Sequence, residues 1–92
     1  METETKQYKV YVDVDLRIDK FGHMLPQRIT WEDGVSYEID KVLGVRPGYA
    51  AKAGGQGDKY AIQVSGQRTY LYFERSPNLT GNVIGRWFVE RK

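Results

Sequence analysis

Asp13, Asp15 and Asp19 have the spacing that comes nearest to a cation-binding loop in this chain. A calcium-binding EF-hand loop carries oxygen ligands at alternate positions and a Gly directly after the third of them. Here Arg17 occupies the third ligand position, and no Gly follows it. We therefore expect no metal site, and we interpret these carboxylates as the solvent-facing side of a strand.

His23 is the single histidine of the chain. Nucleophilic catalysis needs a nucleophile held against a base, with the base oriented by a third polar group. The chain has no Cys, which also excludes disulfides and thiolate metal sites. Because His23 lies in a predicted turn without a recognisable partner, we expect no catalytic residue and a protein that is not an enzyme.

The glycine-rich segment Gly54–Gly57 could direct backbone N–H groups at a phosphate. It lacks the Gly-Lys-Ser/Thr ending of a P-loop and the strand–helix setting of a dinucleotide-binding motif. We interpret it as a flexible linker and expect no cofactor, while an anion at this loop stays open.

Aromatic and Arg residues occupy positions that should face away from the core, and they form the candidate binding site. These residues are Tyr11, Tyr70, Tyr72, Phe88, Arg68 and Arg86. Tyr, Phe and Arg are enriched at protein interfaces, and aromatic rings interleaved with cations also bind single-stranded nucleic acid. We expect a protein partner or a second copy of the chain, with single-stranded nucleic acid as the alternative. The segments 46–58 and 76–84, or a second copy, could instead cover these rings.

Strict alternation of apolar and polar residues predicts the first element that positions this site, a long strand over 8–18. Its even-numbered residues form the buried side. A four-residue turn then leads to a second strand, whose buried residues are Leu25, Ile29 and Trp31. This register sets Val14 opposite Ile29 and Asp15 opposite Arg28.

The next turn, at Glu32–Gly34, contains an Asp-Gly pair that is typical of two-residue hairpin loops. Such a loop would place Trp31 beside Ser36 and mix apolar with polar residues on both faces. A three-residue loop pairs Trp31 with Val35 and puts Gly34 in the left-handed position of a bulge. The same register gathers three charged residues on the outer face: Asp15, Arg28 and Glu38.

The third strand is expected to bend, because Val42 breaks its alternation and indicates a bulge near 40–44. A long connection over 46–58 follows and could hold about one helical turn at 49–53. Further strands are expected over 60–64, 69–73 and 85–90.

A two-residue Gly66-Gln67 turn should join two of these later strands. It would pair Ile62 with Leu71 on the inner face and Lys59 with Glu74 on the outer face.

With 92 residues, 40% of them hydrophobic and 28% charged, the chain is typical of one small globular domain. We expect a flexible tail over 1–5 and a single β-barrel domain over 6–92. The fold class is all-β, a small antiparallel, partly open barrel or curled sheet of about six strands, SH3-like as first choice and OB-like as second. No apolar run is long enough to span a membrane, so we expect a cytoplasmic protein without a membrane partner.

Charge is distributed unevenly along the chain. Residues 1–40 hold nine acids and five bases, a net charge of −4, and residues 41–92 hold three acids and nine bases, a net charge of +6. Such asymmetry can mark a surface for a partner, although cross-strand pairing can also interleave the charges. The total of +2 does not by itself indicate nucleic acid.

The segments ITWEDGVSYEIDKVLGVRPG, KAGGQGDKY, YLYFE and GRWFVE resemble a family of short, uncharacterised bacterial proteins of about this length. The resemblance covers Tyr8 to Glu90. It implies no known chemistry, so no catalytic or binding residue is transferred from it. The residues themselves favour a non-enzymatic binding or adaptor module that uses the aromatic and Arg residues named above.

Overall fold

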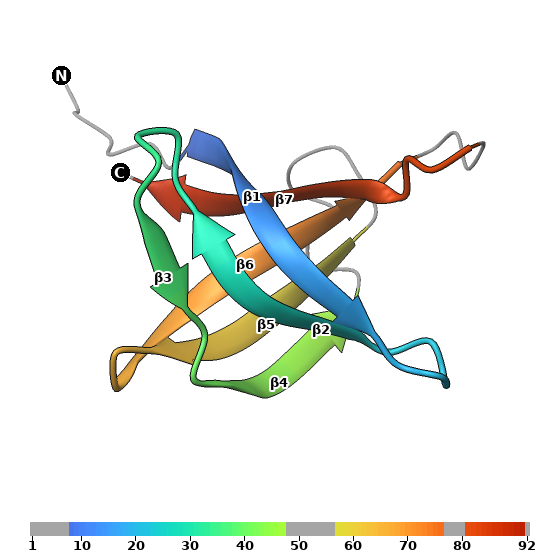
Figure 1. The fold of residues 1–92 in the computed structure, drawn as a ribbon, viewed down its shortest axis with the longest axis horizontal. Helices are drawn as coiled ribbons and strands as arrows, with labels where there is room; N and C mark the ends of the chain where they lie inside the picture. Colours follow the sequence, from blue (N-terminus) through green and yellow to red (C-terminus); the bar gives the residue numbers. More distant parts are fainter. Residues whose placement is uncertain (1–7, 48–56, 77–80, 92) are drawn as a thin grey trace, which may run out of the picture.

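The computed structural model describes residues 8–47, 57–76 and 81–91. Over these residues the chain forms one curled, antiparallel sheet with the strand order β3-β2-β1-β7-β6-β5-β4 (Figure 1). The strands are β1 (Tyr8–Ile18), β2 (Met24–Thr30), β3 (Ser36–Glu38), β4 (Lys41–Pro47), β5 (Gly57–Val64), β6 (Gln67–Arg75) and β7 (Gly85–Arg91). Within this part of the chain, no helix has the length and apolar character needed to cross a membrane. The expected all-β, curled antiparallel architecture is confirmed.

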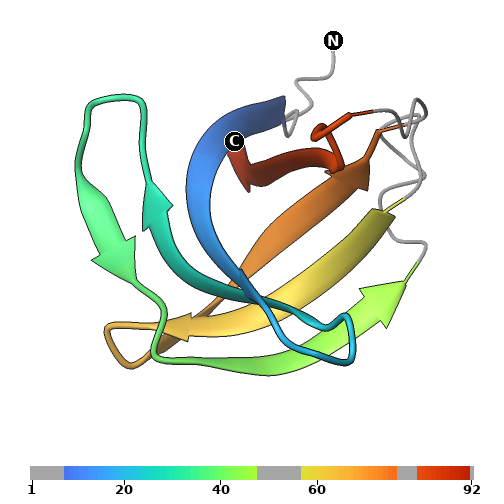
Figure 2. The same ribbon diagram turned by 45° about the vertical axis from the view of Figure 1, so that its right-hand side comes forward.

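The sheet has seven strands instead of six because the third expected strand is divided at Ile39 and Asp40. The Ile39 N–H donates to the Gln27 carbonyl of β2 at 2.9 Å, and the Asp40 N–H donates to the Gln63 carbonyl of β5 at 2.8 Å. Successive residues of one segment thus bond to opposite ends of the sheet. The sheet therefore curls into a half-barrel whose two edge strands, β3 and β4, meet end to end (Figure 2).

The expected bend near 40–44 is also confirmed, since the register of β4 against β5 shifts between Val42 and Gly44. An extra residue on one strand increases the local twist, which is how a flat sheet becomes curved.

The core lies on the concave face of this half-barrel. Trp87 packs against Phe73, with ring centroids 4.9 Å apart, and against Tyr60 at 5.1 Å. The remaining buried members come from five strands: Val12, Ile29, Ile62, Leu71 and Val89. β1, β5, β6 and β7 contribute residues at every second position, as the alternation in the sequence predicts.

The register of β1 against β2 is the expected one up to Asp15, but the expected four-residue turn is wrong, because Ile18 lies opposite Met24 with five residues between them. Val14 lies opposite Ile29 and Asp15 opposite Arg28. Gly34 has a φ of 87°, and the Trp31 N–H donates to the Val35 carbonyl at 2.9 Å. The three-residue loop at 32–34 is therefore confirmed.

One residue of β2 was assigned to the wrong face. The β1–β2 register shifts between Asp15 and Leu16, so that Leu16 lies opposite Pro26 and Arg17 opposite Leu25. Pro26 is buried, and Leu25 falls on the outer side with Arg17. The bulge reverses the alternation beyond it, and the hydrophobic pattern of Leu25 alone did not reveal this.

The predicted Gly66-Gln67 turn is wrong. The turn residues are Ser65 and Gly66, with φ angles of 52° and 78°, which is the type I′ geometry. Ile62 consequently pairs with Thr69, and Tyr60 with Leu71. Lys59 lies opposite Tyr72 and not opposite Glu74. Shifting a register by two residues keeps each side chain on its face, so face parity could not distinguish these turns.

Several expectations lie wholly or partly outside the described residues. They are the tail at 1–5, the helical turn at 49–53, and the parts of the glycine-rich and 76–84 segments at 54–56 and 77–80. Gly57, the last glycine of its segment, begins β5 and is buried.

Candidate functional site: the outer face and the barrel mouth

All six predicted binding residues lie on the convex outer face of the sheet. Tyr11 is paired with Phe88, and Phe88 with Tyr72. On the far side of β6, Tyr70 is paired with Ala61 of β5. The six residues divide into a group around Phe88, which contains Tyr11, Tyr72 and Arg86, and a second group that contains Tyr70 and Arg68.

Two of the predicted contact residues are buried, and this corrects their assignment as partner-facing side chains. Phe88 is 1% exposed and Tyr72 is 7% exposed. Their rings stack at 5.0 Å with an interplanar angle of 8°, and Tyr11 meets Phe88 edge-on at 5.9 Å. They form a small apolar cluster on the convex face. Tyr72 and Phe88 therefore offer no surface to a partner.

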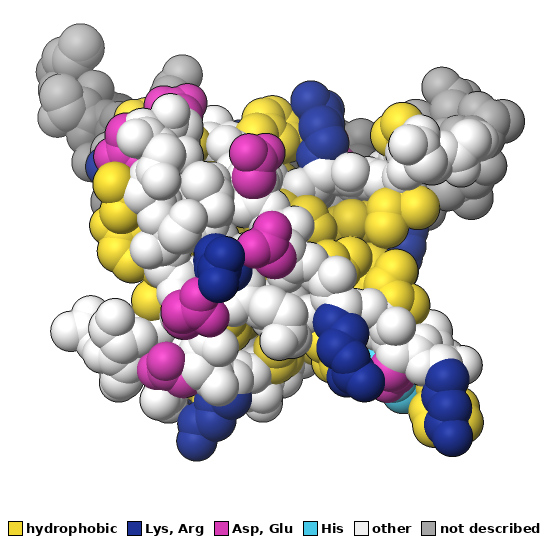
Figure 3. All heavy atoms as spheres, viewed as in Figure 1, with side chains coloured by type: hydrophobic (Ala, Val, Ile, Leu, Met, Phe, Trp, Pro, Cys, Tyr) yellow, Lys and Arg dark blue, Asp and Glu magenta, His cyan; other side chains and the backbone are white. Residues whose placement is uncertain are grey.

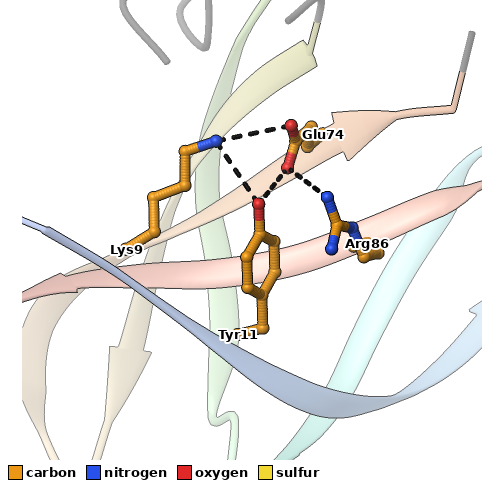
Figure 4. A network of polar contacts seen from close by, with 4 residues as sticks. All are labelled: Lys9, Tyr11, Glu74 and Arg86. Atoms are coloured by element: carbon orange, nitrogen blue, oxygen red, sulfur yellow. Dashed lines mark hydrogen bonds and ion pairs between the residues drawn. The ribbon is translucent and has the colours of Figure 1, made fainter. Parts of the chain in front are cut away.

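A polar network covers one side of this cluster (Figure 4). The Tyr11 hydroxyl donates to Glu74 Oε1 at 2.7 Å, and Lys9 Nζ donates to Glu74 Oε2 at 3.4 Å. Arg86 Nη2 lies 3.8 Å from Glu74 Oε1, and the Arg86 guanidinium lies 4.1 Å from the centroid of the Tyr11 ring. Side chains from β1 and β7 thus meet on one carboxylate of β6, which was expected to pair with Lys59 instead.

The Glu74 carboxylate is charged under ordinary conditions. Burial by itself would raise its pKa, but the hydrogen bond from Tyr11 and the positive charges of Lys9 and Arg86 outweigh this effect. The net result is a pKa below the ordinary value of 4.5. Two predicted binding residues, Tyr11 and Arg86, are therefore engaged within the chain by a charged partner.

The second group surrounds Tyr70, whose side chain is 38% exposed. Lys59 Nζ lies 4.1 Å from the centroid of the Tyr70 ring, and the Arg68 guanidinium lies 5.6 Å from it. Arg46 lies opposite Lys59 on β4. A hollow of about 320 Å³ opens here, and its described lining consists of Leu43, Gly44, Val45, Arg46, Lys59, Ala61, Arg68 and Tyr70. We call it the basic hollow, because its described lining contains three cations and no carboxylate.

A larger hollow lies at the end of the half-barrel between two hairpins, and we call it the mouth. Its volume is about 720 Å³. One wall comes from the β2–β3 hairpin, with Trp31 and Tyr37, and the other comes from the β5–β6 hairpin. The core residues Ile29, Val64 and Val89 form an apolar floor. Arg68 and Tyr70 line the mouth as well as the basic hollow.

The acidic residues near the start of the chain behave as ordinary surface charges. Arg28 Nε donates to Glu38 Oε2 at 2.7 Å, and Arg28 Nη1 lies 3.4 Å from Asp15 Oδ2. Figure 3 shows acidic and basic side chains interspersed over β2 and β3. The expected grouping of these three residues on the outer face is confirmed.

His23 and Asp19 serve the β1–β2 turn. Asp19 Oδ1 accepts hydrogen bonds from the backbone N–H groups of Phe21 and His23, each at 2.9 Å, and Asp19 Oδ2 lies 2.9 Å from His23 Nδ1. The pKa of Asp19 is lowered, mainly by the His23 backbone N–H. Across the described ranges, no group of three or more His, Cys, Asp or Glu side chains is placed to hold a metal ion.

Asp58 is a buried acid that sequence analysis did not single out. Its side chain is 8% exposed, and Oδ2 accepts from Arg75 Nη2 at 3.2 Å. Burial, together with the nearby Asp58 charge, raises the pKa of the Tyr60 hydroxyl, and Arg75 partly opposes this. The Asp58–Arg75 ion pair thus affects the pKa of Tyr60, a core residue. Neither member of the pair belongs to the described lining of the basic hollow or of the mouth.

No family model, no curated protein and no solved structure matches this chain. The resemblance to a family of uncharacterised bacterial proteins therefore stays a prediction. The barrel subtype, SH3-like or OB-like, likewise rests on analogy.

Sequence analysis missed Arg46 and Lys59 as members of the Tyr70 group. The outer-face position of Arg46 follows from the bulge between Val42 and Gly44, which the broken alternation at Val42 indicated. Lys59 was expected on the outer face, but the Ser65-Gly66 turn sets it opposite Tyr72 instead of Glu74.

Replacing Glu74 by Gln should lower the free energy of unfolding at pH 7, because the amide cannot carry the charge that Tyr11, Lys9 and Arg86 stabilise. The folded pKa is depressed, so this contribution is complete above the unfolded pKa and is lost as the pH falls through the folded pKa. Urea unfolding at neutral pH and at about pH 3 should show a difference that shrinks in acid. The exposed loop acid offers a matched control, Glu32→Gln, which should change little at either pH. A Glu74→Gln deficit of equal size at both pH values would contradict this assignment.

The burial of Phe88 predicts a stability effect and not merely a binding effect. Phe88→Ala should lower the free energy of unfolding by about 3 kcal/mol or more, the usual cost of emptying a buried aromatic site. Tyr70→Ala, at a half-exposed ring, should cost about 1 kcal/mol or less. Chemical denaturation of both variants measures the two values. Similar small losses in both would mean that Phe88 is not enclosed.

Proposed function

We propose that this chain is a non-enzymatic binding module that holds an extended segment of a partner protein at the mouth of its half-barrel. The observation that carries the proposal is the open edge of β3, which lies beside the mouth. Two of the predicted binding residues, Tyr70 and Arg68, line this mouth. The proposed site thus includes Tyr70 and Arg68 from the expected aromatic and Arg surface, but its centre lies at the mouth.

The direction of the β3 backbone groups follows from two hydrogen bonds. The Trp31 N–H donates to the Val35 carbonyl, and the Ile39 N–H donates to the Gln27 carbonyl, both at 2.9 Å. In an antiparallel pair, residues that bond to the neighbouring strand alternate with residues that point away. Ser36 and Glu38 are the residues in between, so their N–H and C=O groups point away from β2.

These groups have no strand opposite them among the described residues, because β5 ends too early. The Asp40 N–H bonds to Gln63 of β5, but β5 turns at Ser65 and Gly66. The Asp40 carboxylate fixes this turn by accepting from the Gly66 N–H at 3.0 Å. The backbone groups of Ser36 and Glu38 therefore point toward the space that a continuing strand would occupy.

An added strand would use this edge and the mouth together. Main-chain hydrogen bonds to a free sheet edge give affinity, and alternate side chains enter neighbouring pockets. Here an apolar side chain would contact Ile29, Val64 and Val89, beside the rings of Trp31 and Tyr37. The volume of about 720 Å³ lies in the range of known ligand sites, roughly 300–1,000 Å³.

A single extended segment suits this site better than a second folded copy. The edge of β3 lies between two hairpins, and a folded strand would bring its neighbouring strand about 5 Å away into the same space. The longer edge strand, β4, carries a bulge and ends at Pro47, features that discourage pairing between copies.

Single-stranded nucleic acid is the weaker candidate. Two of the four rings expected to stack on bases, Tyr72 and Phe88, are buried against each other.

The cytoplasm is the proposed location of the module, because a chain without Cys needs no oxidising compartment to fold.

Selection from a random 12-residue peptide library should yield linear peptides that bind at this edge. Glu38→Pro removes the outward N–H and should weaken the best synthetic peptide about tenfold, since one hydrogen bond and the fit of the strand are lost. Glu38→Gln is the matched control, because it also loses the charge paired with Arg28 but keeps the N–H. It should bind nearly as tightly as the wild type in a fluorescence titration.

Three outcomes would overturn the proposal. They are failure to enrich any peptide, equal binding by the Pro and Gln variants, and peptide binding that appears only with self-association in sedimentation. Unfolding curves of both variants confirm that the comparison is made on folded protein.

A further inference from the structure

We infer that the basic hollow around Tyr70 is an anion-binding subsite that takes a phosphorylated side chain of the segment bound at the mouth. This inference rests on the proposed function for the origin of the ligand. The subsite itself consists of Arg46, Lys59, Arg68 and Tyr70, and it can be tested separately.

The charges of the two outer-face groups differ in kind. Around Tyr11, the cations Lys9 and Arg86 are balanced by Glu74 at 3.4 and 3.8 Å. Around Tyr70, three cations line one hollow without a carboxylate in its described lining. Like charges in a shared concave space raise its positive potential and favour an anion there.

Tyr70 positions two of these cations. The Lys59 ammonium lies over the ring at 4.1 Å and the Arg68 guanidinium at 5.6 Å, both within the range of cation–π attraction. Holding the cations before a ligand arrives lowers the ordering cost of binding. Gly44, opposite Ala61, adds no side chain to the hollow, and no atom of the described residues lies within 4 Å of the position that its Cβ would take.

The basic hollow shares two lining residues with the proposed peptide site. Arg68 and Tyr70 line both the mouth and the basic hollow. A segment paired with the β3 edge across the mouth could therefore direct one of its side chains past Tyr70 into the basic hollow. One molecule, an extended peptide with an anionic residue, would then occupy both hollows.

A phosphate group matches this subsite better than a carboxylate does. A phosphorylated residue carries a charge of about −1.5 to −2 at pH 7 and three acceptor oxygens. Guanidinium groups bind such oxygens in paired hydrogen bonds, and Arg46 and Arg68 supply two guanidinium groups beside the Lys59 ammonium. A single carboxylate would leave part of this positive charge unbalanced.

NMR titration with N-acetyl-phosphoserine methylamide tests the subsite without the peptide. Amide shifts should concentrate at Gly44, Ala61 and Tyr70, and the N-acetyl-glutamate analogue should bind about tenfold or more weakly. Arg46→Gln and Arg68→Gln should each weaken the phosphoserine probe about five- to tenfold. Arg17→Gln removes an exposed positive charge from β1 and is the matched control, with no expected effect. Inorganic phosphate should compete at higher concentration.

The inference would be overturned by an absence of shifts at about 20 mM probe, by equal binding of the glutamate analogue, or by an equal effect of Arg17→Gln. Tighter binding of oligo-dT through Arg46 and Arg68 would assign the hollow to nucleic acid and also overturn it. Glu38→Pro should leave the phosphoserine titration unchanged. Failure of the wild type to bind any peptide, with phosphoserine binding intact, would refute the proposed function alone, and peptide binding without phosphoserine binding would refute only this subsite.

Discussion

The architecture depends on one change of backbone hydrogen-bonding direction, at Ile39 and Asp40. Neighbouring residues on a strand present their N–H groups to opposite sides, and here one bonds to β2 and the next to β5. This brings the two edges of a seven-stranded sheet together without a long connection. The hollowed mouth and the free β3 edge are both consequences, because β5 turns away just beyond the point where the two edges meet.

A second set of aromatic residues is packed on the convex face of the sheet. The core fills the concave side, yet Tyr72 and Phe88 are also buried, on the opposite side of the same strands. Tyr11 and Lys9 pack on them and converge on Glu74. This half of the outer face is occupied by contacts within the chain, whereas the described lining of the basic hollow beside Tyr70 contains three cations and no carboxylate. The division of a single stripe of residues into a stabilising half and a candidate binding half comes from the placement of Glu74.

The sequence was sufficient for the positions of most strands and for the register across the β2–β3 loop. The loop at Glu32–Gly34 could be predicted because a shift by one residue reverses every face. The turn at Ser65-Gly66 could not, because a shift by two residues preserves the faces. Leu25 was misplaced because a bulge leaves no clear mark in a short apolar pattern. Burial of Phe88 depends on neighbours brought together by the fold, so the alternation along its strand alone suggested an exposed ring.

Amide hydrogen exchange along β3 tests the open edge most directly. If Ser36 and Glu38 point away from β2 into open space, their N–H groups should exchange nearly as fast as in an unstructured chain, while those of Tyr37 and Ile39 should be protected. Protection of Glu38 as strong as that of Ile39 would mean that the edge is already covered, and it would contradict the account.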